Sequence, residues 1–252
     1  MADTALDPIE QTPLRVQVAD RLRAAIVTGK LRPGAALVET ALAEQLNVSR
    51  APIREAIQDL ENDGLVETVA YKRKRVKPLT VREVAEICDM RTLFEVMAVR
   101  RILERGTPVD SLGESCEAME RAAEAGDRDA LIAADESFHR TLIRLSDHHL
   151  LDQLWAGLYL RIHQIMSLRN DEAVDLRDIA GTHPPIVEAL ADEDLERAVR
   201  LVSEHANALA DFDPASIADP TGLDGAAGLD RATGATDGAN AASEVDTSGR
   251  GQ

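Results

Sequence analysis

The sequence predicts a mainly α-helical protein, with a small N-terminal module followed by an antiparallel all-helical bundle. Apolar residues recur with the 3.6-residue period of a helix over most of the chain between residues 14 and 211. Aromatic residues make up only 2% of the 252 residues although 44% are hydrophobic, so the core must be built from Leu, Ile, Val and Ala. Such side chains suit packed helices better than a β-sandwich.

The formal net charge of −17 is unevenly distributed along the chain. Residues 1–78 carry 12 Lys and Arg against 11 Asp and Glu, a net charge of +1, whereas residues 79–212 carry 14 against 27, a net charge of −13. Residues 213–252 add −5, from 2 basic and 7 acidic residues. Because only the first segment could lie against a polyanion, the charges indicate two modules with different partners.

The N-terminal segment contains the signals of three helices and a β-hairpin. The helices are expected near 14–28, 39–46 and 49–63, and the hairpin at 65–78. Gly29 and Gly64 end the first and third helices, and Ser49 is the expected N-cap of the third. Two helices joined by a short turn and followed by a hairpin form a winged helix-turn-helix, which we place at 11–78 behind a flexible segment 1–10.

The third helix carries the residues expected to read DNA. Arg50 and Arg54 are four residues apart, so they share one face near the helix N-terminus, where arginine can contact guanine or a phosphate group. Five basic residues, expected at the hairpin tip, would contact phosphate groups or the minor groove: Lys72, Arg73, Lys74, Arg75 and Lys77. A solvated helix face and an ordinary basic loop are the alternative, but the order of the elements favours DNA binding.

Residues 79–212 show a helical pattern almost throughout. Six helices are expected near 81–105, 110–125, 127–146, 149–170, 176–190 and 194–211, and their short connections indicate an antiparallel bundle. Residues 213–252 hold almost no large apolar side chains, so we expect a disordered acidic tail. A signal peptide, a membrane-spanning run and a disulfide framework are all missing from the pattern, so we expect a cytoplasmic protein without membrane contact.

Four residues of the bundle could hold a metal ion. Asp135 and His139 stand four apart on one helix face. His183 and His205 lie on opposite sides of an expected helix hairpin, at heights that differ by roughly one helical turn. One carboxylate and three imidazoles would suit zinc, nickel, manganese or a similar divalent ion. A single histidine is more often a hydrogen-bonded polar group than a ligand, and spacing alone leaves both interpretations open.

The segment VETALAEQLNVSRAPIREAIQDLENDGLV (38–66) resembles the helix-turn-helix of the GntR family of bacterial regulators, whose common pattern is LAxxLxVSRxPVREALxxLxxxGLV. The preceding GKLRPGA also matches. The resemblance implies that Ser49, Arg50 and Arg54 contact DNA, with the wing alongside. This chain departs from the pattern at Gln58, where arginine is frequent, and in the wing, which lacks the usual glycine at its tip. These departures concern the operator sequence rather than the ability to bind DNA.

The helices after residue 80 are similar to the FCD ligand-binding domain of the FadR branch of this family. The matching segments are MRTLFEVMAVRRILERG (90–106), DESFHRTL (135–142), GTHPPIVEALADEDLERA (181–198) and SEH (203–205). In that domain an Asp and three His commonly hold a divalent metal, and a small carboxylate effector often completes the coordination. The resemblance therefore implies that Asp135, His139, His183 and His205 are metal ligands. The number of helices is similar to that of the VanR-type subgroup.

Arg91 occupies a position where members of this family often carry an arginine that faces the effector pocket. The resemblance therefore implies that Arg91 binds the effector. An exposed ion pair with Glu95, one helical turn further on, is an equally open interpretation.

Taken together, the sequence predicts a homodimeric transcription regulator. We expect a repressor that binds a palindromic operator in double-stranded DNA and responds to a small carboxylic acid at or near the metal. A metal-dependent hydrolase with the same four ligands is an alternative, but no motif for a general base or an oxyanion hole accompanies them, and the helix-turn-helix would be unexplained. A third alternative is a purely structural metal, with the effector elsewhere or absent.

Overall fold

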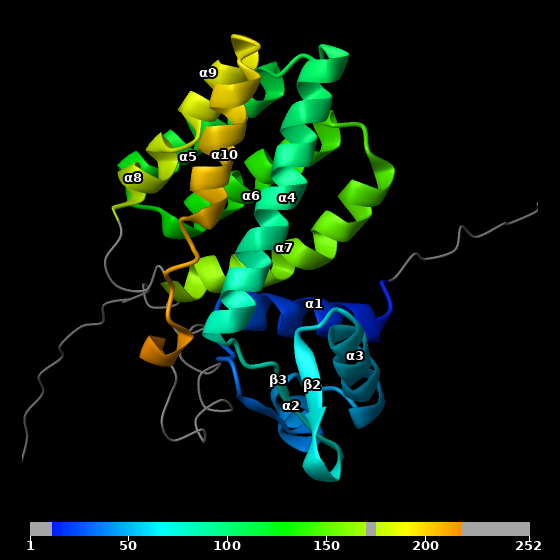
Figure 1. Cartoon of the computed structure of the whole chain (residues 1–252). Helices are drawn as coiled ribbons and strands as arrows, with labels where there is room; N and C mark the ends of the chain where they lie inside the picture. The colour runs from blue at the N-terminus through cyan, green and yellow to red at the C-terminus, as the bar shows by residue number, and fades with distance from the viewer. Residues whose placement is uncertain (1–11, 170–174, 218–252) are drawn as a thin grey trace, which may run out of the picture.

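Figure 1 shows the chain as a computed structural model, which describes residues 12–169 and 175–217. Its N-terminal part consists of three helices and a small sheet. The helices are α1 (Leu14–Val27), α2 (Glu39–Gln45) and α3 (Arg50–Asn62), and the strands are β1 (Ala36–Leu37), β2 (Val66–Val69) and β3 (Arg73–Val76). This is the winged helix-turn-helix that the sequence predicts, with the sheet as the wing.

Apolar residues on one face of α3 fix its orientation against α1. Ile53, Ile57 and Leu60 are three and four residues apart and are fully or almost fully buried. Ser49 lies at the N-cap of α3 in extended backbone, as predicted, but its hydroxyl makes no capping hydrogen bond. Burial of this stripe leaves the opposite face of α3, with the predicted DNA-contacting arginines, exposed.

The wing is an antiparallel sheet with the strand order β1-β3-β2. Arg73 pairs with Val69 at the end of the hairpin, so the turn falls on the short 3-10 helix Ala70–Lys72. The prediction that five basic residues lie at the tip is therefore wrong for all of them except Lys72. Only Lys72 is in the turn, because the next three residues pair one for one with β2 and form β3.

The C-terminal part is a bundle of helices. They are α4 (Val81–Arg105), α5 (Asp110–Ala125), α6 (Arg128–Leu145), α7 (His149–Arg169), α8 (Leu176–Gly181), α9 (Pro184–Ala191) and α10 (Leu195–Asn207). The helix predicted at 176–190 is thus two helices, α8 and α9. Pro184 and Pro185 have no backbone N–H to continue the hydrogen-bond ladder of α8, so the chain breaks there and α9 begins with its prolines in the first turn.

The bundle packs around one apolar core. α4 contacts α6, α7 and α10, and α5 lies against α6, α8 and α9. Large buried side chains fill the interior, among them Leu131, Phe138, Trp155 and Ile162. Inside this apolar shell, α4, α6, α10 and the α8–α9 junction surround a small group of buried polar side chains.

The two parts of the chain touch along α1 and α7, which lie one above the other in Figure 1. Leu160 of α7 packs against the core of the winged helix. Next to it, Arg161 donates a hydrogen bond of 3.4 Å to the carbonyl of Pro78, and Glu83 in the first turn of α4 forms an ion pair of 2.8 Å with Lys77. The segment between wing and bundle is therefore tied to both α4 and α7.

After α10 the chain continues to a second 3-10 helix, η2 (Pro214–Ile217). The disordered tail predicted from residue 213 is therefore wrong for this first turn, where Phe212 and Pro214 are buried. The rest of the tail and the flexible segment 1–10 lie outside the described residues. Cys88 and Cys116 are free thiols, as predicted. Within the described parts of the chain, none of the helices combines the length and apolar character needed to cross a membrane.

Candidate metal centre and DNA-binding surface

The structure brings together the four residues that the sequence analysis named as metal ligands. One potential ligand atom from each of Asp135, His139, His183 and His205 lies within 4.8 Å of the other three. Asp135 and His139 come from one face of α6, His205 from α10, and His183 from the N-cap of α9, where the two prolines set the start of the helix. Asp135, His139 and His183 are at most 1% exposed.

The two shortest distances within this cluster match the edges of a metal coordination sphere. The Nε2 atoms of His139 and His205 are 3.1 Å apart, and Asp135 Oδ1 lies 3.2 Å from His183 Nε2 and 3.7 Å from His139 Nε2. Metal–ligand bonds of about 2.0 to 2.2 Å place neighbouring ligands roughly 3.0 to 3.5 Å apart. Asp135 Oδ2 and His183 Nε2 are buried without a hydrogen-bond partner, and a divalent ion would satisfy both.

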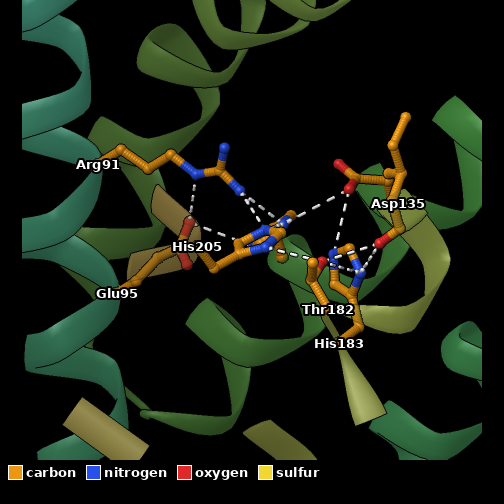
Figure 2. Close-up of polar contacts among 8 residues, drawn as sticks. Arg91, Glu95, Asp135, Thr182, His183 and His205 are labelled. Atoms are coloured by element: carbon orange, nitrogen blue, oxygen red, sulfur yellow. Dashed lines mark hydrogen bonds and ion pairs between the residues drawn. The ribbon is translucent and has the colours of Figure 1, made fainter. Parts of the chain in front are cut away.

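Hydrogen bonds to the Nδ1 atoms of His183 and His205 orient the Nε2 atoms of these imidazoles toward the centre of the cluster (Figure 2). His183 Nδ1 lies 3.1 Å from the carbonyl oxygen of Ile179, and His205 Nδ1 lies 3.1 Å from the hydroxyl oxygen of Thr182. The Thr182 hydroxyl donates its own hydrogen to Ile179, so its oxygen accepts from His205. These contacts favour the tautomers that carry the proton on Nδ1 and leave the Nε2 lone pairs available, as in histidine ligands of metal sites.

Arg91 and Glu95 lie on the inner face of α4, beside this cluster (Figure 2). The Arg91 Nε atom donates a hydrogen bond of 2.8 Å to Glu95, as one of the two interpretations held, but the pair is not exposed: the side chains are 2% and 0% accessible. Arg91 Nη2 lies 2.7 Å from His139 Nε2 and 2.9 Å from His205 Nε2. Glu95 also lies 3.2 Å from His139 Nδ1. Arg91 therefore forms the ion pair with Glu95 in the interior rather than at the surface, and it also contacts two of the candidate metal ligands.

Burial and neighbouring charges shift the pKa values in this network. Burial lowers the pKa of His205 well below its usual value, and His183 and Arg91 lower it further. Burial alone would raise the pKa of Asp135, but His139 and His183 hold it well below its usual value. Burial would lower the pKa of His139, but the charges of Glu95 and Asp135 raise it. An ionised Asp135 and a neutral His205 are the protonation states that metal ligands require.

A cavity of about 200 Å³ adjoins the cluster. It is lined by Arg91, Asp135, Met166, Arg169, Asp178, Ile179, Thr182, His205, Ala208 and Leu209. Ten lining residues thus include two candidate ligands, two arginines and one further carboxylate, beside apolar side chains. A larger cavity of about 480 Å³ between α5 and α8 is lined by none of the four candidate ligands. The smaller cavity is the one that could hold a molecule in contact with a bound metal.

The predicted DNA-contacting arginines lie together on the exposed face of the helix-turn-helix. Arg50 and Arg54 are 58% and 68% exposed and both donate hydrogen bonds to Glu39, in the first turn of α2, at 2.9 to 3.1 Å. Hydrogen bonds from Arg54 and Arg50 lower the pKa of Glu39. One carboxylate therefore holds the two guanidinium groups side by side on this exposed face.

The basic residues of the wing divide into two pairs. Lys72 and Arg73 are exposed, at the turn and the start of β3. Lys74 forms an ion pair of 2.5 Å with Glu61, and Arg75 one of 2.6 Å with Glu67, and both are partly buried. Lys72 and Arg73 are therefore the cations of the wing that are best placed to meet phosphate groups.

Three residues contribute to these sites although the sequence analysis assigned none of them to a site: Glu39, Thr182 and Glu95. Glu39 has an ordinary first-turn position on its helix, and Thr182 has only its place before His183 as a signal. Glu95 carried a signal, because it stands four residues after Arg91 on the same helix face, but the pattern could not decide whether that face is buried.

Comparison with known proteins identifies both parts of the chain. Residues 14–76 match the family model described as bacterial regulatory proteins, gntR family, and residues 86–208 match the FCD domain. The probable D-xylose utilization operon transcriptional repressor of Paenarthrobacter nicotinovorans is 31% identical over 223 residues, which cover 88% of this chain and 97% of the relative.

Two further proteins are similar over most of the chain. The gluconate operon transcriptional repressor of Bacillus subtilis is 30% identical over 199 residues, which cover 76% of this chain and 81% of the relative. The solved structure of McbR/YncC from E. coli has a TM-score of 0.65 and 27% identity, and the match covers 78% of this chain and 95% of that one. These relatives are regulators rather than hydrolases, and the chain accordingly belongs to the GntR family of bacterial transcription regulators, with an FCD domain behind its helix-turn-helix.

Proposed function

We propose that this regulator is a homodimeric repressor whose operator binding is controlled by a small hydroxycarboxylic acid, bound beside a divalent metal in the FCD domain. The observation that carries the proposal is the juxtaposition of three things in the bundle: a four-ligand cluster with metal-site distances, a cavity that adjoins it, and a buried arginine that lines both. The domains involved are those proposed from the sequence, 11–78 for DNA and 79–212 for the effector.

The donor set supports a metal of the zinc, nickel or manganese type. Three imidazoles and one carboxylate are common ligands for these ions, and four protein ligands leave further coordination positions in a five- or six-coordinate site. With a divalent ion bound, the cluster would carry net positive charge next to the cavity. A carboxylate group in the cavity could complete the coordination, and the guanidinium of Arg91 could hold its other oxygen.

The remaining cavity lining supports an acid that also carries hydroxyl groups. Asp178 can accept hydrogen bonds from hydroxyl groups, and Arg169 can donate to them or to a second carboxylate. A volume of about 200 Å³ suits a small molecule rather than a fatty acid or a peptide. Two relatives are named for the D-xylose utilization and gluconate operons, which supports a sugar-derived acid as the class to test first.

An exposed apolar stripe on α4 supports the homodimer. Met90, Leu93 and Met97 are three and four residues apart and are 39–55% exposed. A second copy of this chain is the partner that fits, because a helix-turn-helix that reads a palindromic operator does so as a two-fold dimer. The opposite face of the same helix carries Arg91 and Glu95. Movement of α4 on effector binding would therefore reach the dimer interface directly.

The contacts at the other end of α4 provide a route to the DNA-binding domain. Its first turn holds Lys77, at the base of the wing, through Glu83. We propose that a shift of α4 changes the spacing of the two winged helices against the two half-sites, and that operator affinity falls. A repressor of this kind acts on the chromosome, in the bacterial cytoplasm.

The test begins with an operator selected from random DNA by the metal-loaded protein. Aldonic, aldaric and simple hydroxy acids are then titrated into the protein–DNA complex, followed by fluorescence anisotropy, with the amide of the best acid as the control. We expect release by one acid and not by its amide. Equal affinity of that acid for metal-loaded and chelator-treated protein would contradict a role of the metal in effector binding.

A further inference from the structure

The side chain of Arg91 makes contacts that a metal-bound cluster could not keep. Its Nη2 atom lies 2.7 Å from His139 Nε2 and 2.9 Å from His205 Nε2, and these two nitrogens are themselves only 3.1 Å apart. Each Nε2 atom of a neutral imidazole has one lone pair when its proton is on Nδ1. The two N–H groups of Arg91 Nη2 point at the same two lone pairs that a metal ion would use.

These contacts of Arg91 stabilise the cluster electrostatically. When His139 and His205 both carry their proton on Nδ1, two lone pairs face each other across 3.1 Å in a buried site that also contains Asp135, and they require a positive group beside them. The guanidinium of Arg91 supplies that charge, and a divalent ion would supply it in the same place. Coordination and the Arg91 hydrogen bonds therefore exclude each other at both imidazoles.

The hydrogen bond to Glu95 limits how the side chain of Arg91 can move. It holds the Nε atom at 2.8 Å, so the planar guanidinium group can move only as a rigid unit about this hydrogen bond, and such a tilt carries its terminal nitrogens away from the imidazoles. Arg91 also lines the cavity of about 200 Å³. If its Nη2 atom left the imidazoles while Glu95 kept its hold on Nε, both terminal N–H groups would become available to a carboxylate in that cavity.

We propose that Arg91 is an internal competitor of the metal: its guanidinium binds His139 and His205 in place of the ion, and metal binding releases it to hold the acid. The inference rests on the proposed function, and it adds an order to the two binding events. The acid finds its guanidinium partner only after the metal has displaced it, which makes the two ligands positively coupled.

The experiment is a titration of chelator-treated full-length protein with Co²⁺ alone, followed by the visible absorption of the bound ion, at one pH above the usual pKa of histidine. The test variant is Arg91→Lys, which keeps the charge beside Glu95 but loses the forked contact with both imidazoles. Arg91→Gln is the second variant, in case either substitution disturbs folding, and melting curves identify such a loss. The matched control is Arg169→Lys, because Arg169 lines the same cavity but donates to the carbonyl of Ala208 and not to an imidazole.

We expect Arg91→Lys and Arg91→Gln to bind Co²⁺ about tenfold or more tightly than the unaltered protein, since each charge-assisted hydrogen bond that competes with the metal is removed. Arg169→Lys should change the affinity less than about threefold, because its hydrogen bond does not compete for an imidazole. The same Arg91 variants should show a smaller gain in acid affinity on metal addition.

Unchanged or weaker Co²⁺ binding by folded Arg91 variants would overturn the competition while leaving the proposed metal and effector in place. If neither the unaltered protein nor any variant bound Co²⁺, the metal site itself would be refuted, and the inference with it.

Discussion

The two parts of this chain place their charged groups in opposite environments. In the winged helix, Arg50 and Arg54 are more than half exposed and share the exposed face of the helix-turn-helix with Glu39. In the bundle, Arg91, Glu95, Asp135, His139 and His183 are at most 2% exposed. Exposed ion pairs contribute little to stability, whereas buried charges destabilise a fold unless each has a partner.

The difference in exposure determines how a bound ligand affects the stability of each part. Arginines on a surface can exchange one carboxylate for DNA phosphate and bases without disturbing the fold, so binding and stability are separable. A buried polar cluster is packed on all sides, so a change in the partners of its side chains also affects the packing of the helices that carry them. Loss or gain of a ligand in the bundle should therefore change its stability, and this is the property that a sensor domain needs.

The largest expected effect separates binding from stability in the winged helix. The double variant Arg50→Ala/Arg54→Ala should lose operator affinity by about a hundredfold or more, since an arginine with a bidentate base contact contributes about 5- to 150-fold. The melting temperature should hardly change, because both side chains are exposed. Fluorescence anisotropy and calorimetry measure the two quantities. Full operator affinity in the double variant would contradict the assignment of α3 as the recognition helix.

Removal of the metal should change the stability of the bundle, whereas the arginine substitutions in the winged helix should not change stability. We expect about one divalent ion per chain, and chelation should lower the melting temperature, because a ligand at a hundred times its Kd stabilises the folded state by about 2.7 kcal/mol. His139→Ala and His205→Ala should lower metal occupancy, measured by elemental analysis. His163→Ala is the control, because His163 lies on α7 outside the four-ligand cluster. Equal occupancy in all three variants would refute the ligand set.

A substitution of Glu95 tests the metal site through a residue that contacts a candidate ligand but is not itself one. Glu95→Gln should weaken metal binding by about ten- to a hundredfold, because the charge near His139 Nδ1 that orients this imidazole is lost. Isothermal titration with Co²⁺ measures the effect, and Glu136→Gln serves as the matched carboxylate control, because Glu136 lies on α6 but pairs with Arg140 and not with a candidate ligand. Unaltered Co²⁺ affinity in Glu95→Gln would show that Glu95 has no part in the metal site.

The wing should show a smaller effect that depends on the pair of residues altered. Lys72→Ala/Arg73→Ala should weaken binding to all DNA sequences alike. The slope of affinity against salt concentration should fall by about 1 for each phosphate group that the wing no longer neutralises. Lys74→Ala/Arg75→Ala should change the slope less, because Glu61 and Glu67 already neutralise these residues. Equal slopes for both pairs would mean that the ion pairs of β3 open on DNA.

The smallest expected effect is a pH dependence in the bundle. Burial lowers the pKa of His163, so the neutral form is favoured in the folded state. The stability that this contributes is present above the usual pKa of about 6.5 and is lost as the pH falls toward the lowered value. Melting curves of the unaltered protein and of His163→Gln should therefore approach each other as the pH falls from 8 to 5, roughly the range in which histidine titrates. A constant difference would contradict the assignment.

Local signals explain why much of the fold could be predicted. The apolar period of a helix and its capping residues, such as Ser49 and Gly29, act over a few residues along the chain. The helices of the winged helix-turn-helix accordingly lie within a few residues of their predicted bounds. Where two local signals competed, the prediction was wrong. A basic run was placed at a loop tip although its residues pair in β3, and one helix was predicted over 176–190 although Pro184 and Pro185 mark the start of a second one.

The helical fold class, the helix-turn-helix and the residue types for a metal site could be predicted from the sequence, because these depend on spacing along one element. The contacts of Arg91 could not, because they join it to His139 across 48 residues and to His205 across 114. The same is true of Glu95, whose burial depends on the packing of α4 against α6 and α10. Side-chain periodicity reports which residues share a face, but the partner of that face is set by the packing of the whole bundle.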